Sequence, residues 1–205
     1  MLEKLAPRPG RHALLPELTA QQEVALLCRA LHREGYDDHV AGHITVAQPD
    51  GTFLVNPWEL AWDELTADDI IRVDGEGAVV EGDPVFYDEY AGTVDGASEA
   101  EAAAEALGDA KWAILKNHGV FVVAKDIRQA HLRAITLEHR CRLAWQVETL
   151  GEGQPITDPQ ALRVAQMSDD LGSPFLWEAM ARREIRLDPK VLGEDGAWDK
   201  IPSAK

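Results

Sequence analysis

Two apolar stretches, residues 112–116 and 120–124, constrain the fold of this chain more than any other feature. Each is rich in aliphatic, β-branched or aromatic side chains, and three residues, Asn117-His118-Gly119, separate them. Short apolar runs bounded by a turn are typical of strands that lie inside a sheet. We therefore expect both stretches to be sheet strands that a tight polar turn connects.

The turn at residues 117–119 is also a candidate metal site. It would hold the imidazole of His118 at the end of a sheet, and neutral imidazole binds zinc, iron and similar divalent ions. Asn and Gly are equally ordinary residues of a hairpin turn, and zinc sites normally take three or four protein ligands. Taken alone, the turn therefore favours a plain connection over a metal ligand.

Helical and strand-like patterns are interspersed along the rest of the chain. Periodic apolar residues with capping signals predict helices at residues 19–34, 98–107, 126–150 and 174–187 and a short helical turn at 68–69. Two further hairpins are predicted, one pairing residues 43–47 with 52–56 and the other pairing 70–74 with 78–81. Because the strands come mostly as hairpins, antiparallel or mixed pairing in an α+β or α/β/α layer is expected. The main domain should cover residues 15–152, and residues 153–205 should form a linker and a helical tail.

The charge of the chain excludes two classes of partner. With 20 basic and 36 acidic side chains, its formal net charge is −16 at pH 7, which disfavours binding to nucleic acid or to an anionic membrane surface. No apolar run reaches the roughly 18 residues of a membrane helix, and no signal-peptide core is present, so a soluble, cytoplasmic protein is expected. Its two cysteines, Cys28 and Cys141, lack any C-x-x-C spacing, which argues against a disulfide framework or a cysteine-built zinc site.

The first predicted hairpin carries a group of candidate substrate-binding residues. Gly42, His43 and Thr45 meet at the start of its first strand, where backbone N–H groups beside a hydroxyl can hold an anionic oxygen. Asn56 and Trp58 follow its second strand and could line the same pocket, with an amide at one end and an apolar wall. The alternative is an ordinary loop at the start of a strand and a tryptophan in the core.

Several short motifs follow one another in a particular order between about residues 18 and 150. They are Gly42-His43-Ile44-Thr45, Phe53-Leu54-Val55-Asn56-Pro57, Leu65-Thr66-Ala67-Asp68-Asp69-Ile70 with Val73-Asp74 and Gly77, Glu81-Gly82, and Lys116-Asn117-His118-Gly119-Val120 before a helix with Leu137-Glu138. In this order and spacing the chain resembles the class II aldolase/adducin family. That family includes sugar-phosphate aldolases and epimerases, related decarboxylases and the adducin head domain.

The resemblance implies an α/β fold, a class II aldolase-like α/β/α sandwich with a mainly antiparallel central sheet. It also implies a divalent metal ion held by histidines, with zinc ahead of iron and manganese, and a homo-oligomer, usually a four-fold tetramer. His118 matches the last metal-binding histidine of the family. The resemblance therefore favours a metal ligand at the turn that residues 117–119 form.

One part of the family pattern has no counterpart in this sequence. After Glu81-Gly82, family members continue with an acidic catalytic residue, a helix and a His-x-His pair on a strand, which complete the metal site. Here Asp83 and Pro84 lead directly to residues 85–90, which resemble family sequence from well beyond that pair. Either the sequence omits a segment of the complete protein, or the chain is a shortened relative with a damaged site. Omission is favoured, because loss of an internal strand would expose apolar surface of a sheet.

The reaction implied by the resemblance is metal-assisted cleavage of a carbon–carbon bond. The phosphate-binding aldolases of the family carry an Asn at the position of His43 and a small polar turn at residues 56–59. Here Glu59 would repel a phosphate, and Trp58 offers a single donor. We therefore expect an aldolase- or decarboxylase-type lyase that acts on a small, non-phosphorylated carbonyl or carboxylate compound. The alternative is a non-catalytic binding or oligomerisation module like the adducin head. The tail from Gln154 to Lys205 is a further candidate for subunit contacts, because of the apolar face around residues 175–180.

Overall fold

The computed structural model describes residues 15–75, 79–81, 104–105, 107–115, 119–154, 158–171 and 173–194. These residues include the helices α1 (Ala20–Arg33), α3 (Ile127–Leu150), α4 (Pro159–Leu171) and α5 (Pro174–Leu187), and the 3-10 helices η2 (Ala67–Asp69) and η3 (Pro189–Leu192). They also include the strands β1 (Thr45–Ala47), β2 (Phe53–Val55), β3 (Ile71–Val73), β4 (Val79–Glu81), β5 (Trp112–Leu115) and β6 (Gly119–Val122). None of the described helices combines the length and hydrophobicity that a bilayer crossing requires.

The described strands form two separate antiparallel sheets. Strands β1, β2, β3 and β4 follow one another across sheet A, whereas β5 and β6 form the two-stranded sheet B. In sheet A, Thr45 lies opposite Val55, and Phe53 lies opposite Val73. Because opposite residues of antiparallel strands point to the same side, these four side chains share one face of sheet A.

Helix α1 is the centre of the hydrophobic core. It begins with a capping box in which Thr19 Oγ1 accepts a hydrogen bond from the Gln22 N–H, while the Gln22 side chain accepts one from the Thr19 N–H. Every side chain from residue 24 to residue 31 is buried, and this run exceeds two helical turns. The helix is therefore covered on all sides.

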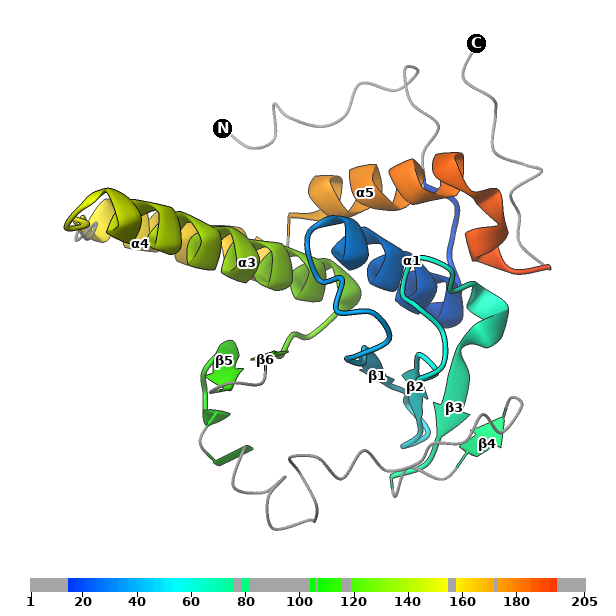
Figure 1. Ribbon diagram of the computed structural model, residues 1–205. Coiled ribbons are helices and arrows are strands. Elements are labelled where there is room, and N and C mark those ends of the chain that lie inside the picture. Colours follow the sequence, from blue (N-terminus) through cyan, green and yellow to red (C-terminus); the bar gives the residue numbers. More distant parts are fainter. Residues whose placement is uncertain are drawn as a thin grey trace.

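Helix α1 lies between sheet A and α5, as Figure 1 shows. Leu54 of β2 faces α1 from one side, and Trp177, Ala181 and Ile185 of α5 enter the same core from the other. The amino-terminal half of α3 also packs against α1, through residues such as Ala134. The predicted domain boundary at residue 152 falls between α3 and α4, but α5 beyond it contributes to the main core.

Most of the predicted elements are confirmed. The helices expected at residues 19–34, 126–150 and 174–187 correspond to α1, α3 and α5, and all three hairpins form. Of the helix expected at residues 98–107, only 104, 105 and 107 are described, and these three are helical. Helix α4 and η3 were not expected, because the sequence around them carries no capping box or continuous apolar stripe.

The expectation that residues 112–116 and 120–124 lie inside a sheet is wrong for the described part of the chain. Strands β5 and β6 pair only with each other, and neither contains a buried residue. The side chain of Ile114 is 67% exposed, and Val120 and Phe121 are exposed as well. A two-stranded hairpin buries little surface, so its apolar side chains remain open to solvent. Such exposure is the expected consequence of a missing internal strand.

Candidate functional site

The loop before β1 is held in place by the side chain of Asn56. This asparagine is 2% exposed, and its Oδ1 accepts a hydrogen bond from the backbone N–H of Ile44 at 2.7 Å. Its Nδ2 donates to the backbone carbonyls of Gly42 and Pro57, each at 3.3 Å. Because these bonds occupy the amide on both sides, Asn56 positions the loop, and the predicted contact of Asn56 with substrate stays a prediction.

Gly42 allows the backbone of the same loop to turn just before His43. Its φ of 89° lies in the left-handed region that favours glycine, and a Cβ at this position would stand 3.3 Å from the indole of Trp62. The tight approach to Trp62 and the two hydrogen bonds of Asn56 fix the backbone on either side of His43. These contacts therefore hold the backbone of His43, and with it the imidazole, in a fixed position.

His43 lines a cavity of about 250 Å³ over one face of sheet A. Its ring centroid is 6.1 Å from that of Trp58, and the two ring planes are inclined by 49°. Although the residue as a whole is exposed to solvent, partial burial of the ring lowers the pKa of His43 from its ordinary value. The imidazole is therefore neutral at pH 7 and can both donate and accept a hydrogen bond.

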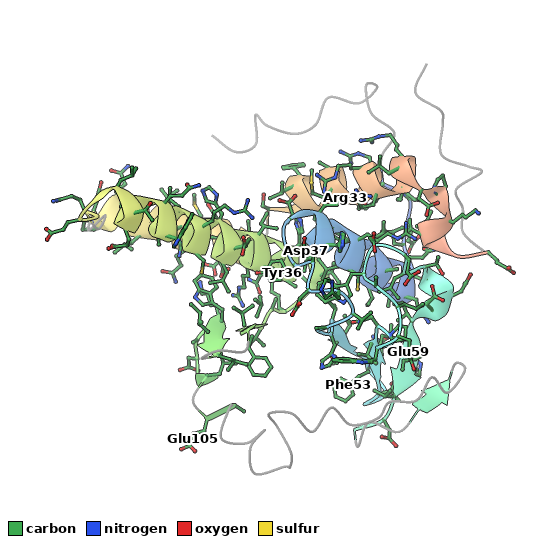
Figure 2. The ribbon with its side chains drawn as sticks, viewed as in Figure 1. Arg33, Tyr36, Asp37, Phe53, Glu59 and Glu105 are labelled. Carbon is green, nitrogen blue, oxygen red and sulfur yellow. The ribbon has the colours of Figure 1, made fainter. Side chains whose placement is uncertain are left out.

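The strand register explains which side chains line the rest of the cavity. Thr45, Phe53, Val55 and Val73 share one face of sheet A and line the cavity with His43, Asp74 and Gly75. Leu54, between two of these residues, points to the α1 core instead. Figure 2 shows Phe53 on the side of the sheet away from the helices. Among the described lining residues, Asp74 carries a carboxylate and none is a Lys or Arg.

The structure thus brings together all five predicted substrate-binding residues, with Asn56 holding the loop by its hydrogen bonds to Gly42 and Ile44. His43 and Thr45 line the cavity, Trp58 contacts His43, and Gly42 holds the loop that carries the imidazole. The sequence did not point to Phe53 and Asp74 as lining residues. The signal that could have found them is the pairing of the two predicted hairpins with each other. That pairing places Phe53 opposite Val73, which directly precedes Asp74.

The predicted metal ligand, His118, lies outside the described residues. Within the described residues, no group of three or more His, Cys, Asp or Glu side chains lies close enough to hold a metal ion. A metal site normally requires three or four protein ligands. The described part of the chain therefore does not fit a complete metal site, and the ligand role of His118 stays a prediction.

Three known proteins resemble this chain along much of its length. A putative aldolase class 2 protein of Caulobacter vibrioides is 22% identical, over 71% of this chain and 79% of its own length. An adducin-related protein of Schizosaccharomyces pombe is 24% identical, over 56% of this chain and 55% of its own length. The structure of L-fuculose 1-phosphate aldolase from Glaciozyma antarctica superposes with a TM-score of 0.73 at 23% identity, and the match covers 86% of this chain and 96% of the aldolase. That superposition confirms the expected class II aldolase-like fold.

The lengths of these alignments bear on the gap expected after Asp83. The alignment with the Caulobacter protein extends over 202 residues, whereas 71% of this 205-residue chain is about 146 residues. Several dozen aligned positions thus have no counterpart in this chain. The S. pombe adducin-related protein gives the same result, because its alignment of 177 residues includes 56% of this chain, about 115 residues. Both relatives support the prediction that family sequence is missing from the interior of this chain.

The family model agrees with this interpretation. It matches residues 22–91 and, as a second segment, residues 81–145, so the two matches meet in the region that contains Asp83. Together the segments cover more than half of the chain, and they include the cavity on sheet A, sheet B and most of α3. The chain belongs to the family of the class II aldolase and adducin N-terminal domain.

Proposed function

We propose that the complete protein is a divalent-metal-dependent carbon–carbon lyase, of the aldolase or decarboxylase type. The family supports a lyase-type function, and the finer assignment rests on one observation, the small cavity in which the neutral imidazole of His43 stands beside Thr45 and Asp74. At about 250 Å³, this cavity is smaller than most drug-sized ligand pockets, and it suits a compound of a few carbon atoms.

The charge of the cavity favours a non-phosphorylated substrate. A phosphate is usually bound by Arg, Lys or backbone N–H groups at a helix N-terminus. The described lining residues provide neither a basic side chain nor a helix start, and the carboxylate of Asp74 would repel a dianion. Glu59, labelled in Figure 2 on the segment after β2, is exposed and adds a second negative charge to this part of the chain.

The lining residues can instead orient a small hydroxy-carbonyl or carboxylate compound. His43 can share a proton with a substrate hydroxyl or carbonyl oxygen, and the Thr45 hydroxyl can donate a second hydrogen bond. Phe53 and Val73 form an apolar wall that reduces the access of water to one side of the compound. Gly42 and Asn56 keep the imidazole in a fixed position. We assign these residues to substrate binding and positioning.

The proposed cofactor is a divalent metal ion, with zinc ahead of iron and manganese. When bound, such an ion polarises a carbonyl and stabilises the negative charge left by bond cleavage. We propose His118 as one ligand and place the other ligands in the segment that this sequence lacks. The intact mass of the protein purified from its native host tests this point, because a segment of several dozen residues raises the mass well above 22.5 kDa. A mass equal to 22.5 kDa contradicts it.

A non-catalytic module is the second candidate function. It is favoured by the lack of a metal-binding cluster among the described residues and by the match to an adducin-related protein. A module of this kind would keep the fold and bind a partner. A metal analysis separates the two proposals, because the lyase carries about one divalent ion per chain when isolated at neutral pH.

The lyase proposal is tested with matched pairs of hydroxy-carbonyl and keto-acid compounds, each with and without a phosphate group. The native protein should release an aldehyde or carbon dioxide from the non-phosphorylated member, and a chelator should abolish the release. The variant His43→Ala should reduce kcat/KM by about 10-fold or more, as expected for loss of a hydrogen bond that orients the substrate. His139→Ala changes an exposed imidazole on α3 and serves as the control. Preference for the phosphorylated member contradicts the substrate class, and no turnover of any pair favours the module.

A further inference from the structure

A second cavity, of about 530 Å³, lies between α3, α4 and the start of β5. Figure 1 shows that α4 runs back along α3, and side chains of both helices line the cavity. On α3, Leu132, Thr136 and Arg140 are four residues apart and therefore share one face of the helix. The volume lies within the range of roughly 300–1,000 Å³ that is typical of pockets for small organic ligands.

The cavity is separate from both sites to which the lyase proposal assigns residues. None of its lining residues also lines the cavity beside His43. In sheet B, Trp112 lies opposite Val122, at the end of the hairpin away from the turn at residues 117–119. A ligand in this cavity would therefore be distinct from the substrate of the proposed lyase.

Hydrogen bonds and ion pairs hold α4 in place as one wall of the cavity. Asp169 of α4 accepts two hydrogen bonds from the Arg133 guanidinium, at 2.7 and 2.8 Å, and an ion pair joins it to Lys111 at 2.8 Å. The Gln129 side chain donates to the Asp169 backbone carbonyl at 3.0 Å. Because these contacts connect α4 to α3 and to the start of β5, they give the cavity fixed walls.

The lining carries an excess of positive charge. The whole chain has 36 acidic and 20 basic side chains, but three basic side chains, Lys111, Arg133 and Arg140, and a single acidic one line this cavity. Lys111 and Arg133 both pair with that one carboxylate, Asp169. Within the part of the chain that the structure describes, no carboxylate pairs with Arg140, whose guanidinium carbon lies 5.7 Å from the centroid of the Trp112 ring. Arg140 therefore remains available to an anion from solution.

The other lining residues indicate the shape of that anion. Leu132 of α3, Leu162 of α4 and the ring of Trp112 give the cavity apolar walls, and the Thr136 hydroxyl offers a hydrogen bond. A guanidinium binds a carboxylate through two parallel hydrogen bonds, and apolar walls bind an apolar body. A compound with a carboxylate at one end and an apolar group at the other matches both features.

We propose that this cavity binds an organic monocarboxylate whose carboxylate pairs with Arg140 and whose apolar body packs between Trp112 and the leucines of α3 and α4. A monoanion fits better than a phosphate dianion, because Asp169 repels a second negative charge and already engages the other two basic side chains. The proposal does not depend on the lyase activity.

Isothermal titration calorimetry of the native protein with four probes tests the ligand class. Phenylpropionate should bind, whereas phenylpropionamide, which lacks the charge, and acetate, which lacks the apolar body, should each bind about 10-fold more weakly or worse. Phenyl phosphate should bind no more tightly than phenylpropionate. A native protein that binds none of the probes at millimolar concentration overturns the proposal, and so does equal binding of the amide or a clear preference for the phosphate.

Three variants test the position of the site. Arg140→Gln should raise the Kd of phenylpropionate by about 10-fold or more, and its far-UV circular dichroism should be unchanged because Arg140 is exposed. Arg163→Gln changes an exposed arginine of α4 outside the cavity and should bind like the native protein. His43→Ala should also bind like the native protein, which separates this cavity from the proposed substrate site. Unchanged binding by Arg140→Gln, or loss of binding in His43→Ala, overturns the proposal.

Discussion

The two halves of the described chain differ in how completely they bury their apolar side chains. Around α1, residues 24–31 are all buried, and Trp177 and Ile185 of α5 close the core. Along α3, α4 and sheet B, large apolar side chains such as Trp145 and Ile114 remain exposed. The first half thus finds its packing partners within the chain. The second half requires surfaces that the described residues do not supply.

Two tryptophans provide the strongest test of this difference. Replacement of Trp177, which is buried, by Ala should lower the free energy of unfolding by about 3–5 kcal/mol, because it leaves a large cavity in the core. Replacement of Trp145 by Ala should change it by less than about 0.5 kcal/mol in dilute protein. Urea unfolding followed by circular dichroism measures both.

Equal losses for the two tryptophan variants in dilute protein would contradict the comparison. That result would mean that Trp145 is buried within the single chain, against residues that lie outside the described part.

The buried half also contains an imidazole with an unusual environment. His131 is 1% exposed and packs against Trp177 at 5.6 Å between ring centroids, and neither ring nitrogen has a hydrogen-bond partner among the described residues. Burial lowers the pKa of His131 to about 4, and the positive charge of Arg183 acts in the same direction. The side chain is therefore neutral in the folded protein over most of the pH range.

From this histidine we predict that the free energy of unfolding decreases as the pH is lowered from about 6.5 to about 4. In this window the unfolded chain binds a proton that the folded chain does not, so the free energy of unfolding decreases as the pH falls, by about 3 kcal/mol over the whole window. Urea unfolding of His131→Phe at pH 7 and pH 4.5 should show a smaller decrease than the native protein. His139→Phe, which changes an exposed imidazole, should behave like the native protein. Identical pH dependence in all three proteins would contradict the prediction.

The same contrast explains how much of the fold could be predicted from the sequence. Helix α1 can be predicted from its own residues, because they contain the Thr19 and Gln22 capping box and a periodic apolar face. Helix α4 has a weaker local signal, Asp158 capping the Gln160 N–H with Pro159 as first residue. Its apolar residues Val164 and Met167 face solvent, and the distant pairing of Asp169 with Arg133 holds it in place. The exposure of sheet B among the described residues could not be predicted from residues 112–124 alone either, since an apolar run does not show which strands lie beside it in space.

The candidate site shows the same division between local and distant signals. His43 and Thr45 could be named because a glycine and a strand start mark them in the sequence. The positioning role of Asn56 could not, since it depends on hydrogen bonds to Gly42 and Ile44, more than ten residues away. The burial of His131 could not be predicted either, because it depends on Trp177 of α5, which lies far along the chain. Helical spacing shows which residues share a face but not what packs against that face.

The smallest expected effect concerns the loop under His43. Gly42 and Gly51 both have a left-handed φ, of 89° and 85°, so an Ala at either position should cost about 1 kcal/mol of folding free energy. A Cβ at Gly51 meets no atom within 4 Å, whereas a Cβ at Gly42 stands 3.3 Å from the Trp62 indole. Only Gly42→Ala should therefore displace the loop and with it the imidazole.

The pair of variants separates stability from the geometry of the site. Both should lose a similar amount of stability in urea unfolding, but only Gly42→Ala should raise the apparent pKa of His43 toward its ordinary value, because a displaced ring is less desolvated. Proton NMR of the imidazole resonances measures that pKa without any substrate. If the pKa of His43 is the same in both variants, Gly42 contributes no more to the cavity than any turn glycine, and the burial of the ring must come from Trp58 and the strands alone.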